Sequence, residues 1–312
     1  MQQPLDIALN DIRPIVRALG FDPVALTALH GGSTKVWRID VVTGEPLVLK
    51  TYPEGVGWAP GKEAYAAGLL SGLDMPVTRY LLVDETKAKL PVVFAITNYL
   101  PGLPLRDLKS EPDIEDAYRQ MGMLIRRLHD RRFTEYGYIG HDGIIGPQLS
   151  NAAAMRQLVD DSFRKFRHFG ADAGLARRLE AIVEDRFALF SHSTSPVFAH
   201  DDVHQGNVLA ARDANGKLRL TGLIDFGNVR AADPVYDLAK CLFCAEHEDP
   251  RCRGPMLEGY GPIPHPEPEA AMWLYTLFHR VMMWWWLRFI GAIAADEPHN
   301  LIDSLEAMTA EA

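Results

Sequence analysis

Residues 198–210 read FAHDDVHQGNVLA and place two histidines, two adjacent aspartates and an asparagine between apolar flanks. Asp and Asn are poor strand formers, and they are costly to bury without partners. Their concentration beside an expected strand at residues 196–199 therefore indicates a functional site.

A β-hairpin is expected directly after this stretch. The segments NVLAARD and KLRLTGLID flank Ala214-Asn215-Gly216, and Asn-Gly between alternating apolar residues is a strong hairpin signal. With the turn at Asn215-Gly216, the numbers of facing residues sum to about 431. Asn207 is then within one residue of opposite Asp225, so two oxygen donors converge.

Toward the N-terminus, residues 24–98 have the pattern of an antiparallel sheet. Strand-like segments bounded by turn formers are VALTALHGG, KVWRIDVV, PLVLKTY, VTRYLLVD and PVVFAITN, with one helix among them from Gly61 to Leu70. After residues 99–104 the apolar period becomes helical, in AYRQMGMLIRRLH, NAAAMRQLVDDSFRKFRHF and LARRLEAIVEDRFALF. The pattern predicts an α+β protein that divides near this point.

The composition excludes several classes of protein. The 312 residues are 47% hydrophobic and 23% charged, which is typical of a globular chain. A net charge of −9 argues against nucleic acid as a partner and is compatible with a cationic small substrate. Three cysteines cannot form a disulfide framework, and the N-terminus lacks the pattern of a signal peptide, so we expect a cytoplasmic protein.

The most apolar segment, residues 271–295, is interrupted by His279, Arg280 and Arg288. A membrane span needs roughly 20 predominantly apolar residues, so we expect a buried helix and no membrane contact. Three consecutive tryptophans, Trp284 to Trp286, lie in it. Neighbours along a helix differ by about 100° in direction, so one ring must point away from the core, and it could face a substrate cleft.

Four residues together have the pattern of a phosphoryl-transfer site. Asn207 and Asp225 offer the hard oxygen donors that suit Mg²⁺, and Asp202 is a carboxylate placed to orient a hydroxyl and accept its proton. Lys50 ends the strand-like run LVLK upstream. Phosphoryl transfer depends mostly on alignment and on neutralising charge, which these groups can supply.

The motifs HDDVHQGN and IDFGNVRAADPVYDLA resemble those of the aminoglycoside phosphotransferase-like family, which shares the protein-kinase fold and usually has HGDLHxGN and IDxG there. The resemblance extends from Gly31 to the helix beginning at Asp233. It implies a bilobal fold, with a small antiparallel β-sheet lobe at residues 1–98, a hinge near 97–102 and a larger, mainly helical lobe at 99–312. ATP or GTP would lie between the lobes.

The resemblance also implies roles for individual residues. Asp202 would be the catalytic aspartate, Asn207 and Asp225 would hold Mg²⁺, and Lys50 would grip the α- and β-phosphates. Glu63 is the expected partner of Lys50, because it is the only acid between Glu54 and Asp74. The nucleotide would further contact the glycine-rich turn through Gly31, Gly32 and Ser33, and its adenine would bond to the hinge backbone at Asn98, Tyr99 and Leu100.

Two departures from known patterns are informative. Asp201 replaces the family's glycine before the catalytic aspartate, which raises the cost of ionising both carboxyls unless Asp201 turns away into hydrogen bonds or reaches a cationic substrate. Only Asn228 to Ala232 separate the IDFG motif from Asp233-Pro234, which leaves no room for the activation loop of a protein kinase. Peptide substrates are therefore not expected.

The expected function is transfer of the γ-phosphoryl group to a hydroxyl of a small molecule, with an aminoglycoside or another antibiotic, and hence antibiotic resistance, as the leading case. Alternatives are a metabolite kinase for an amino alcohol, amino acid or sugar, and a nucleotide-binding module without turnover. Specificity would come from helices between Ala152 and Phe190 and after Glu267. The residues do not indicate an oligomeric state.

Other metal sites were weighed against this interpretation. His200, Asp201, Asp202 and His204 have spacings that suit a divalent-metal hydrolase, but such a site gives Lys50 no role, and we expect the histidines to hold the loop through Asp237 or backbone carbonyls. Cys241 and Cys244 could begin a zinc site with Cys252 or His247. They fall in a helix expected from Asp233, where buried structural cysteines are the simpler interpretation.

Overall fold

The computed structural model describes residues 7–29, 34–55, 59–193, 195–294 and 299–311. The chain forms two compact units: the first comprises residues 1–110, 139–143 and 206–228, and the second residues 111–138, 144–205 and 229–312. The hairpin after residue 206 thus belongs with the N-terminal sheet, while a domain boundary at residue 98 stays a prediction. Within the described residues, no helix is long and apolar enough to cross a membrane.

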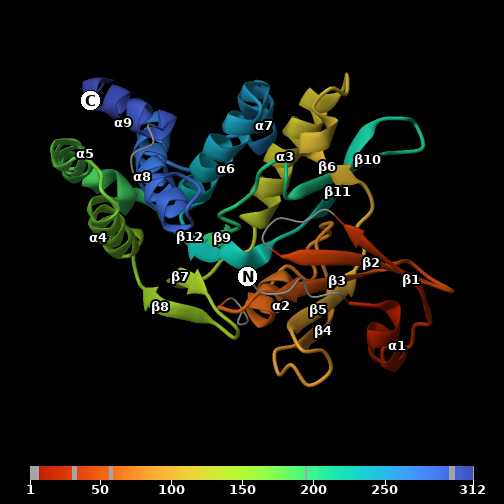
Figure 1. Ribbon diagram of the computed structural model, residues 1–312. Coiled ribbons are helices and arrows are strands. Elements are labelled where there is room, and N and C mark those ends of the chain that lie inside the picture. Colours follow the sequence, from red (N-terminus) through yellow and green to blue (C-terminus); the bar gives the residue numbers. More distant parts are fainter. Residues whose placement is uncertain (1–6, 30–33, 56–58, 194, 295–298, 312) are drawn as a thin grey trace. The chain divides into compact units, whose positions relative to one another are not determined.

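The first unit is built on a five-stranded antiparallel sheet (Figure 1). Its strands, in spatial order, are β1 (Pro23–Leu29), β2 (Lys35–Val41), β3 (Leu47–Tyr52), β5 (Val93–Asn98) and β4 (Tyr80–Asp84). They coincide with the five expected segments, because each segment alternates between the two faces of the sheet and ends at turn formers.

One helix packs on each face of this sheet. Helix α1 (Leu9–Ala18), which the sequence pattern did not predict, buries Ile12, Ile15 and Val16 in a cluster with the sheet residues Trp37, Ile39, Leu47, Leu49, Phe94 and Ile96. Helix α2 (Ala59–Gly68) lies on the other face, where Ala59 packs with Tyr52 and Ala95. Lys50 shares the Tyr52 face, because residues two apart in a strand point the same way.

A second sheet of the first unit has the order β11-β10-β6. Strands β10 (Val208–Arg212) and β11 (Leu218–Leu223) form the expected hairpin, and β6 (Leu103–Pro104) pairs with β10. The facing pairs begin with Val208 and Leu223, whose numbers sum to the predicted value, and slip by one at a bulge between Leu209 and Ala210. The register prediction is confirmed at the end of the hairpin that carries Asn207 and Asp225.

The second unit is mainly helical. Its helices are α3 (Ile114–Leu128), α4 (Asn151–His168), α5 (Ala173–Asp185), α6 (Pro234–Glu248), α7 (Arg253–Tyr260), α8 (Pro268–Phe289) and α9 (Asn300–Glu311). Helices α3 and α7 approach closely at two glycines, since a Cβ on Gly122 would lie 2.0 Å from the Met256 carbonyl oxygen and one on Gly259 1.9 Å from that of Arg119. Larger side chains at these glycines would push the helices apart.

A four-stranded sheet accompanies these helices, in the order β8-β7-β12-β9. Its strands are β7 (Tyr136–Ile139), β8 (Ile144–Gln148), β9 (Val197–Ala199) and β12 (Arg230–Ala232). The end of the IDFG motif forms a 3₁₀ turn, η3 (Phe226–Asn228). The short connection after it continues into strand β12, which lies between β7 and β9. Asp233 caps α6 by accepting a hydrogen bond from the Val235 amide at 2.6 Å, as the sequence predicted.

The apolar helix expected near the C-terminus is α8. Trp284 is buried, Trp285 is half-buried and Trp286 is 43% exposed. One of the three consecutive rings thus leaves the core, as helix geometry requires. The exposed ring is tilted against Phe289 and does not line the cavity described below.

Candidate active site

The ammonium group of Lys50 and the carboxylate of Glu63 form an ion pair inside the first unit. Lys50 Nζ donates hydrogen bonds to Glu63 Oε1 and Oε2 at 3.0 and 2.8 Å. The Glu63 side chain is 3% exposed and that of Lys50 is 16% exposed. A buried carboxylate is retained only with such partners, so strand β3 and helix α2 are joined at this point.

Two tyrosines that the sequence analysis did not single out complete the surroundings of Glu63. The hydroxyls of Tyr52 and Tyr80 both donate to Glu63 Oε2, at 2.9 and 2.5 Å. Burial, and after it the charge of Glu63, raises the pKa of Tyr52 and of Tyr80, so both stay protonated donors. Tyr52 could have been anticipated from its position two residues after Lys50 on the same strand.

Asn207 and Asp225 meet at the open end of the β10–β11 hairpin. The Ile224 amide donates to the Asn207 carbonyl oxygen at 3.0 Å, which continues the ladder to the residue before Asp225. Asn207 is buried, and the Asp225 side chain is 50% exposed with its Oδ1 3.9 Å from Lys50 Nζ. An amide oxygen and an open carboxylate are a donor set that suits Mg²⁺.

The backbone around Asp225 is held in an unusual conformation. Asp225 has φ +69°, in the left-handed region, which costs a non-glycine residue roughly 1–2 kcal/mol. Lys62, which is fully buried on α2, donates from Nζ to the carbonyl oxygen of Gly227. Helix α2 therefore contacts both the Lys50 ammonium, through Glu63, and the segment that follows Asp225.

In the second unit, Asp237 holds the backbone of the loop that precedes Asp202. Its carboxylate accepts hydrogen bonds from the backbone amides of His200 and Asp201, at 3.2 and 2.7 Å. The ring of His129 lies 3.0 Å from Asp237 Oδ2. Asp237 thus anchors the loop through backbone amides, whereas the sequence predicted the histidine rings of the loop for this contact. The imidazole at Asp237 is that of His129, the residue directly after α3. His204 instead faces Glu248, with Nδ1 2.7 Å from Oε1.

Asp201 turns away into a buried network of charges. Its carboxylate accepts from Arg230 Nε at 2.9 Å, from the Tyr236 hydroxyl at 3.1 Å and from Lys240 Nζ at 3.3 Å. Burial alone would raise the pKa of Asp201, but Lys240 and Arg230 outweigh burial and lower the pKa. The sequence left two alternatives for Asp201, namely internal hydrogen bonds or contact with a cationic substrate, and the structure shows internal hydrogen bonds.

The backbone conformation of Asp201 is one that favours glycine, the residue at this position of the motif HGDLHxGN that the sequence resembles. Asp201 has φ +59°, a left-handed conformation that glycine adopts without strain and that aspartate tolerates better than most residues. Lys240 reinforces it by also donating to the Asp201 carbonyl oxygen at 3.0 Å. The next residue, Asp202, is half-buried.

The hinge residues lie at the end of strand β5. The amide of Asn98 donates to the Arg79 carbonyl oxygen at 3.0 Å, and the amide of Tyr99 donates to that of Pro46 at 3.2 Å. Leu100 packs over Gly222 of β11, where a Cβ would lie 3.0 Å from its Cδ1. The other predicted nucleotide contacts, Gly31, Gly32 and Ser33, lie outside the described residues.

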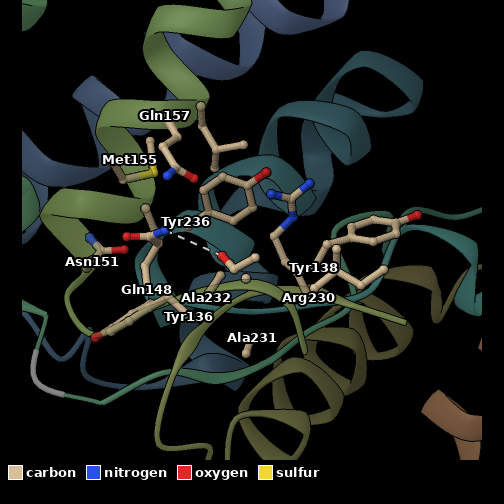
Figure 2. Close-up of a pocket in the computed structure, with 15 residues that line it drawn as sticks. Tyr136, Tyr138, Gln148, Asn151, Met155, Gln157, Arg230, Ala231, Ala232 and Tyr236 are labelled. Carbon is tan, nitrogen blue, oxygen red and sulfur yellow. Dashed lines mark hydrogen bonds between the residues drawn. The ribbon is translucent and has the colours of Figure 1, made fainter. Parts of the chain in front are cut away.

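A cavity of about 280 Å³ lies in the second unit (Figure 2). Strands β7, β8 and β12 supply most of its wall, and α4 and Tyr236 the rest. Its lining residues are Tyr136, Gly137, Tyr138, Ile145, Gly146, Gln148, Asn151, Ala154, Met155, Gln157, Leu158, Arg230, Ala231, Ala232 and Tyr236. Helix α4 lies in the region expected to give specificity, whereas strands β7, β8 and β12 were not anticipated as part of a site.

The alternative metal sites receive no support from the geometry. Within the described ranges, no three His, Cys, Asp or Glu side chains are grouped so that they could hold a metal ion. Cys241 is buried within α6, and burial raises the pKa of its thiol and of the Cys244 thiol, the latter to about 12.

Comparison with family models matches residues 25–274 to the model described as "Phosphotransferase enzyme family". The search of curated proteins finds no match. Among solved structures, the chain is similar to a putative fructosamine-3-kinase from Thermobifida fusca YX-ER1, with 20% identity, a TM-score of 0.68 and coverage of 98% of this chain and 100% of the other.

Two further solved structures have different substrates in their descriptions. A thermostable mutant of aminoglycoside phosphotransferase APH(4)-Ia, in a ternary complex with AMP-PNP and hygromycin B, has 18% identity, a TM-score of 0.62 and coverage of 89% and 96%. Macrolide 2'-phosphotransferase MphH from Brachybacterium faecium has 16% identity, a TM-score of 0.60 and coverage of 96% and 97%. At these identities the similarities show the fold, and the expected α+β, protein-kinase-like class is confirmed.

Proposed function

The chain belongs to the phosphotransferase enzyme family, and from this membership we propose that it transfers the γ-phosphoryl group of ATP to a hydroxyl of a small molecule. The resemblance drawn from the HDDVHQGN and IDFG motifs is confirmed at the level of the family. Small-molecule phosphotransfer is thus the activity of the chain, and the nucleotide, the metal ion and the roles of individual residues are the parts proposed here.

One observation carries the proposal, namely the ammonium of Lys50 between two carboxylates. It bonds to buried Glu63 at 2.8 Å and lies 3.9 Å from Asp225, whose side chain is half exposed. Glu63 fixes the position of the Lys50 ammonium, and the exposed carboxylate of Asp225 lies beside that ammonium. Binding of a nucleoside triphosphate requires a fixed cation for the phosphates and, next to it, a carboxylate that can hold a metal ion.

ATP is the proposed phosphoryl donor. The similar aminoglycoside phosphotransferase was solved with the ATP analogue AMP-PNP, which favours ATP over GTP. In this chain the amides of Asn98 and Tyr99 already donate to Arg79 and Pro46. Of the three hinge amides, that of Leu100 is therefore the proposed donor to adenine. The Leu100 side chain packs over Gly222.

Asn207 and Asp225 are the proposed holders of Mg²⁺. The hairpin register brings their backbones to the same end of the ladder, and the exposure of the Asp225 carboxylate leaves it open to an ion. When bound, Mg²⁺ neutralises charge on the phosphates. Lys50 contributes a second positive charge from the protein itself.

Asp202 is the proposed catalytic residue. It lies five positions before Asn207 on a loop whose preceding amides are held by Asp237. In the proposed step the acceptor oxygen bonds to the γ-phosphorus, the bond from that phosphorus to the β–γ bridging oxygen breaks, and ADP leaves. The hydroxyl proton passes to Asp202 and then to solvent.

Nucleotide titration of two variants tests these assignments. Lys50→Met should weaken binding of Mg²⁺-ATP at least tenfold, about 1.4 kcal/mol, and Lys217→Met, on the exposed hairpin turn, is its matched control. Asp202→Asn should abolish turnover and keep nucleotide affinity within about threefold, because it removes the proton acceptor and not a phosphate contact. Equal nucleotide affinity of wild type and Lys50→Met would refute the assigned role of Lys50.

A further inference from the structure

The charged groups that line the cavity in the second unit indicate whether a cationic or an anionic acceptor would bind there. Its lining, as far as the structure describes the chain, contains no Asp or Glu, and Arg230 is its only charged member. Several ammonium groups taken from water into this site would have only tyrosine rings and neutral polar groups to replace their hydration, and they would meet the like charge of Arg230. This cavity is therefore unsuited to a polycationic amino sugar.

Arg230 is held as a fixed cation on the cavity wall. Its Nε donates to Asp201, and its guanidinium lies 5.2 Å from the ring centroid of Tyr236 and 5.8 Å from that of Tyr138. Figure 2 shows the guanidinium beside the Tyr236 ring. A planar guanidinium whose orientation is set in this way suits a carboxylate, because two N–H groups can bond to its two oxygens.

The remaining lining is mostly apolar or aromatic, with three neutral polar side chains, Gln148, Asn151 and Gln157. Tyr136, Tyr138 and Tyr236 surround the cavity together with Ile145, Met155 and Leu158. Asn151 is already engaged, because its amide donates to the Phe190 carbonyl oxygen and the Tyr275 hydroxyl. At about 280 Å³ the cavity lies at the lower limit for ligand sites, roughly 300–1,000 Å³, so its occupant is small.

The cavity wall is joined to the catalytic loop within the same unit. Arg230 and Tyr236, which line the cavity, both bond to the carboxylate of Asp201, and Asp201 precedes Asp202 in the chain. A ligand carboxylate on Arg230 would therefore contact a side chain that also bonds to Asp201, the residue before the proposed proton acceptor Asp202. This continuity makes the cavity a candidate for the acceptor.

We propose that this cavity takes the non-reacting part of the acceptor, and that the acceptor is a small hydroxylated compound with an aromatic or branched aliphatic body and one carboxylate, which Arg230 binds. The proposal rests on the proposed phosphotransferase function. It replaces a cationic antibiotic with a hydroxycarboxylate as the acceptor class of this chain.

Ligands that share one aromatic body and differ in their charged group test the acceptor class. Calorimetric titration without nucleotide would compare para-(hydroxymethyl)benzoate with its amide and with para-(hydroxymethyl)benzylamine, next to hygromycin B and a branched aliphatic hydroxy acid. We expect the carboxylates to bind at least about tenfold more tightly than the amine and hygromycin B. Tighter binding of a cation, or no binding of any carboxylate at millimolar concentration, would overturn the proposal.

Substitutions locate the binding at the cavity. Ala154→Leu adds side-chain volume to the lining and should weaken carboxylate binding about tenfold. Ala153→Leu makes the same change at the adjacent residue of α4, outside the lining, and should leave binding unchanged. Arg230→Gln should abolish the preference for the carboxylate over its amide, and Arg230→Lys should restore part of it. Equal binding by Ala154→Leu and Ala153→Leu would place the ligand elsewhere.

Failure of the proposal is distinguishable from failure of the proposed function. Acceptor binding is measured here without ATP, so it does not depend on turnover. A protein that phosphorylates only amines or amino sugars would keep the function and lose the acceptor class. A protein that binds the carboxylates but no Mg²⁺-nucleotide would lose the function, and the cavity would remain a carboxylate site.

Discussion

Asp201 combines a strained backbone with a buried charge. Lys240 and Arg230 both depend on its carboxylate, and removing one partner from a buried ion pair typically costs about 3–5 kcal/mol. Glycine at this position would recover about 1–2 kcal/mol of left-handed strain. The loss of charge is the larger effect, so the aspartate side chain stabilises the fold by more than its backbone conformation costs.

We therefore expect Asp201→Gly to lower the free energy of unfolding by roughly 2–3 kcal/mol, measured by urea denaturation at neutral pH. Adding Lys240→Met should recover a large part of the loss, because one of the two unpaired cations is removed with it. An Asp201→Gly variant as stable as wild type would show that the network does not stabilise the fold.

His279 links stability to pH. It is fully buried, and its ring lies with Nε2 2.9 Å from the Tyr236 carbonyl oxygen, so Nε2 carries the proton that it donates. Burial, and then the charge of Lys240, lowers the pKa of His279 from 6.5 to about 3. Between these two values the unfolded chain takes up a proton and the folded chain does not, so stability falls as pH falls.

The expected contribution of His279 is about 1.4 kcal/mol per pH unit below pH 6.5. His279→Gln keeps a donor for the carbonyl and removes the titration, so its unfolding free energy should fall less steeply by that amount between pH 6 and about 4. His168→Gln, at an exposed position, is the control and should follow wild type. Parallel pH profiles for wild type and His279→Gln would contradict the assignment.

At the scale of elements, helix α2 joins two parts of the proposed nucleotide site. Glu63 bonds to Lys50 on β3, and the preceding Lys62 bonds to the carbonyl oxygen of Gly227, two residues after Asp225. Neighbouring residues of one helix thus contact a strand and the segment after the hairpin. A displacement of α2 would disturb Lys50 and Asp225 together.

Lys62→Met keeps most of the side-chain volume and removes the donor to Gly227. Leaving that half-buried carbonyl with one hydrogen bond fewer should cost about 1 kcal/mol of stability. We also expect weaker binding of Mg²⁺-ATP, since Lys62 positions the segment that carries Asp225, and partial rescue by Lys62→Arg. Titration of both variants beside Lys217→Met measures this. Unchanged affinity with reduced stability would limit Lys62 to a structural role.

The elements that could be predicted from sequence are those with local signals. The five-stranded sheet and the β10–β11 hairpin follow from alternation and from the Asn215-Gly216 turn, and the register is correct until the bulge at Leu209, which has no local signal. Helix α1 escaped prediction because Pro14 lies inside it, and proline usually argues against a helix interior. Strands β7 and β8 contain Gly137, Gly146 and Pro147, which weaken a strand pattern.

The candidate site divides in the same way. Lys50, Glu63, Asn207 and Asp225 could be selected because motifs and a single available acid identified them. The structure places Glu63 and Asp225 beside Lys50, and their roles stay predictions. Tyr80 could not be selected. It donates to Glu63 from β4, and the register of β4 against β5 shifts between Tyr80 and Leu82. The cavity could not be foreseen, because it depends on β7 and β8 and on pairing with β12, which are contacts distant in sequence.

At the scale of the whole molecule, the two units hold different parts of the proposed chemistry. The first contains Lys50, Glu63, Asn207 and Asp225, and the second contains Asp202 and the cavity at Arg230. The nucleotide is proposed to bind to the first unit and the acceptor to the second. We propose that these residues together transfer the γ-phosphoryl group of ATP to the acceptor.

Phosphorus NMR of the purified protein with Mg²⁺-ATP and the hydroxycarboxylate panel tests that claim most directly, because it observes donor and product together. We predict a phosphomonoester resonance that grows in step with ADP for wild type, and no such resonance for Asp202→Asn at nucleotide concentrations that saturate both proteins. ATP that persists with every acceptor, or that yields inorganic phosphate alone, would contradict the account.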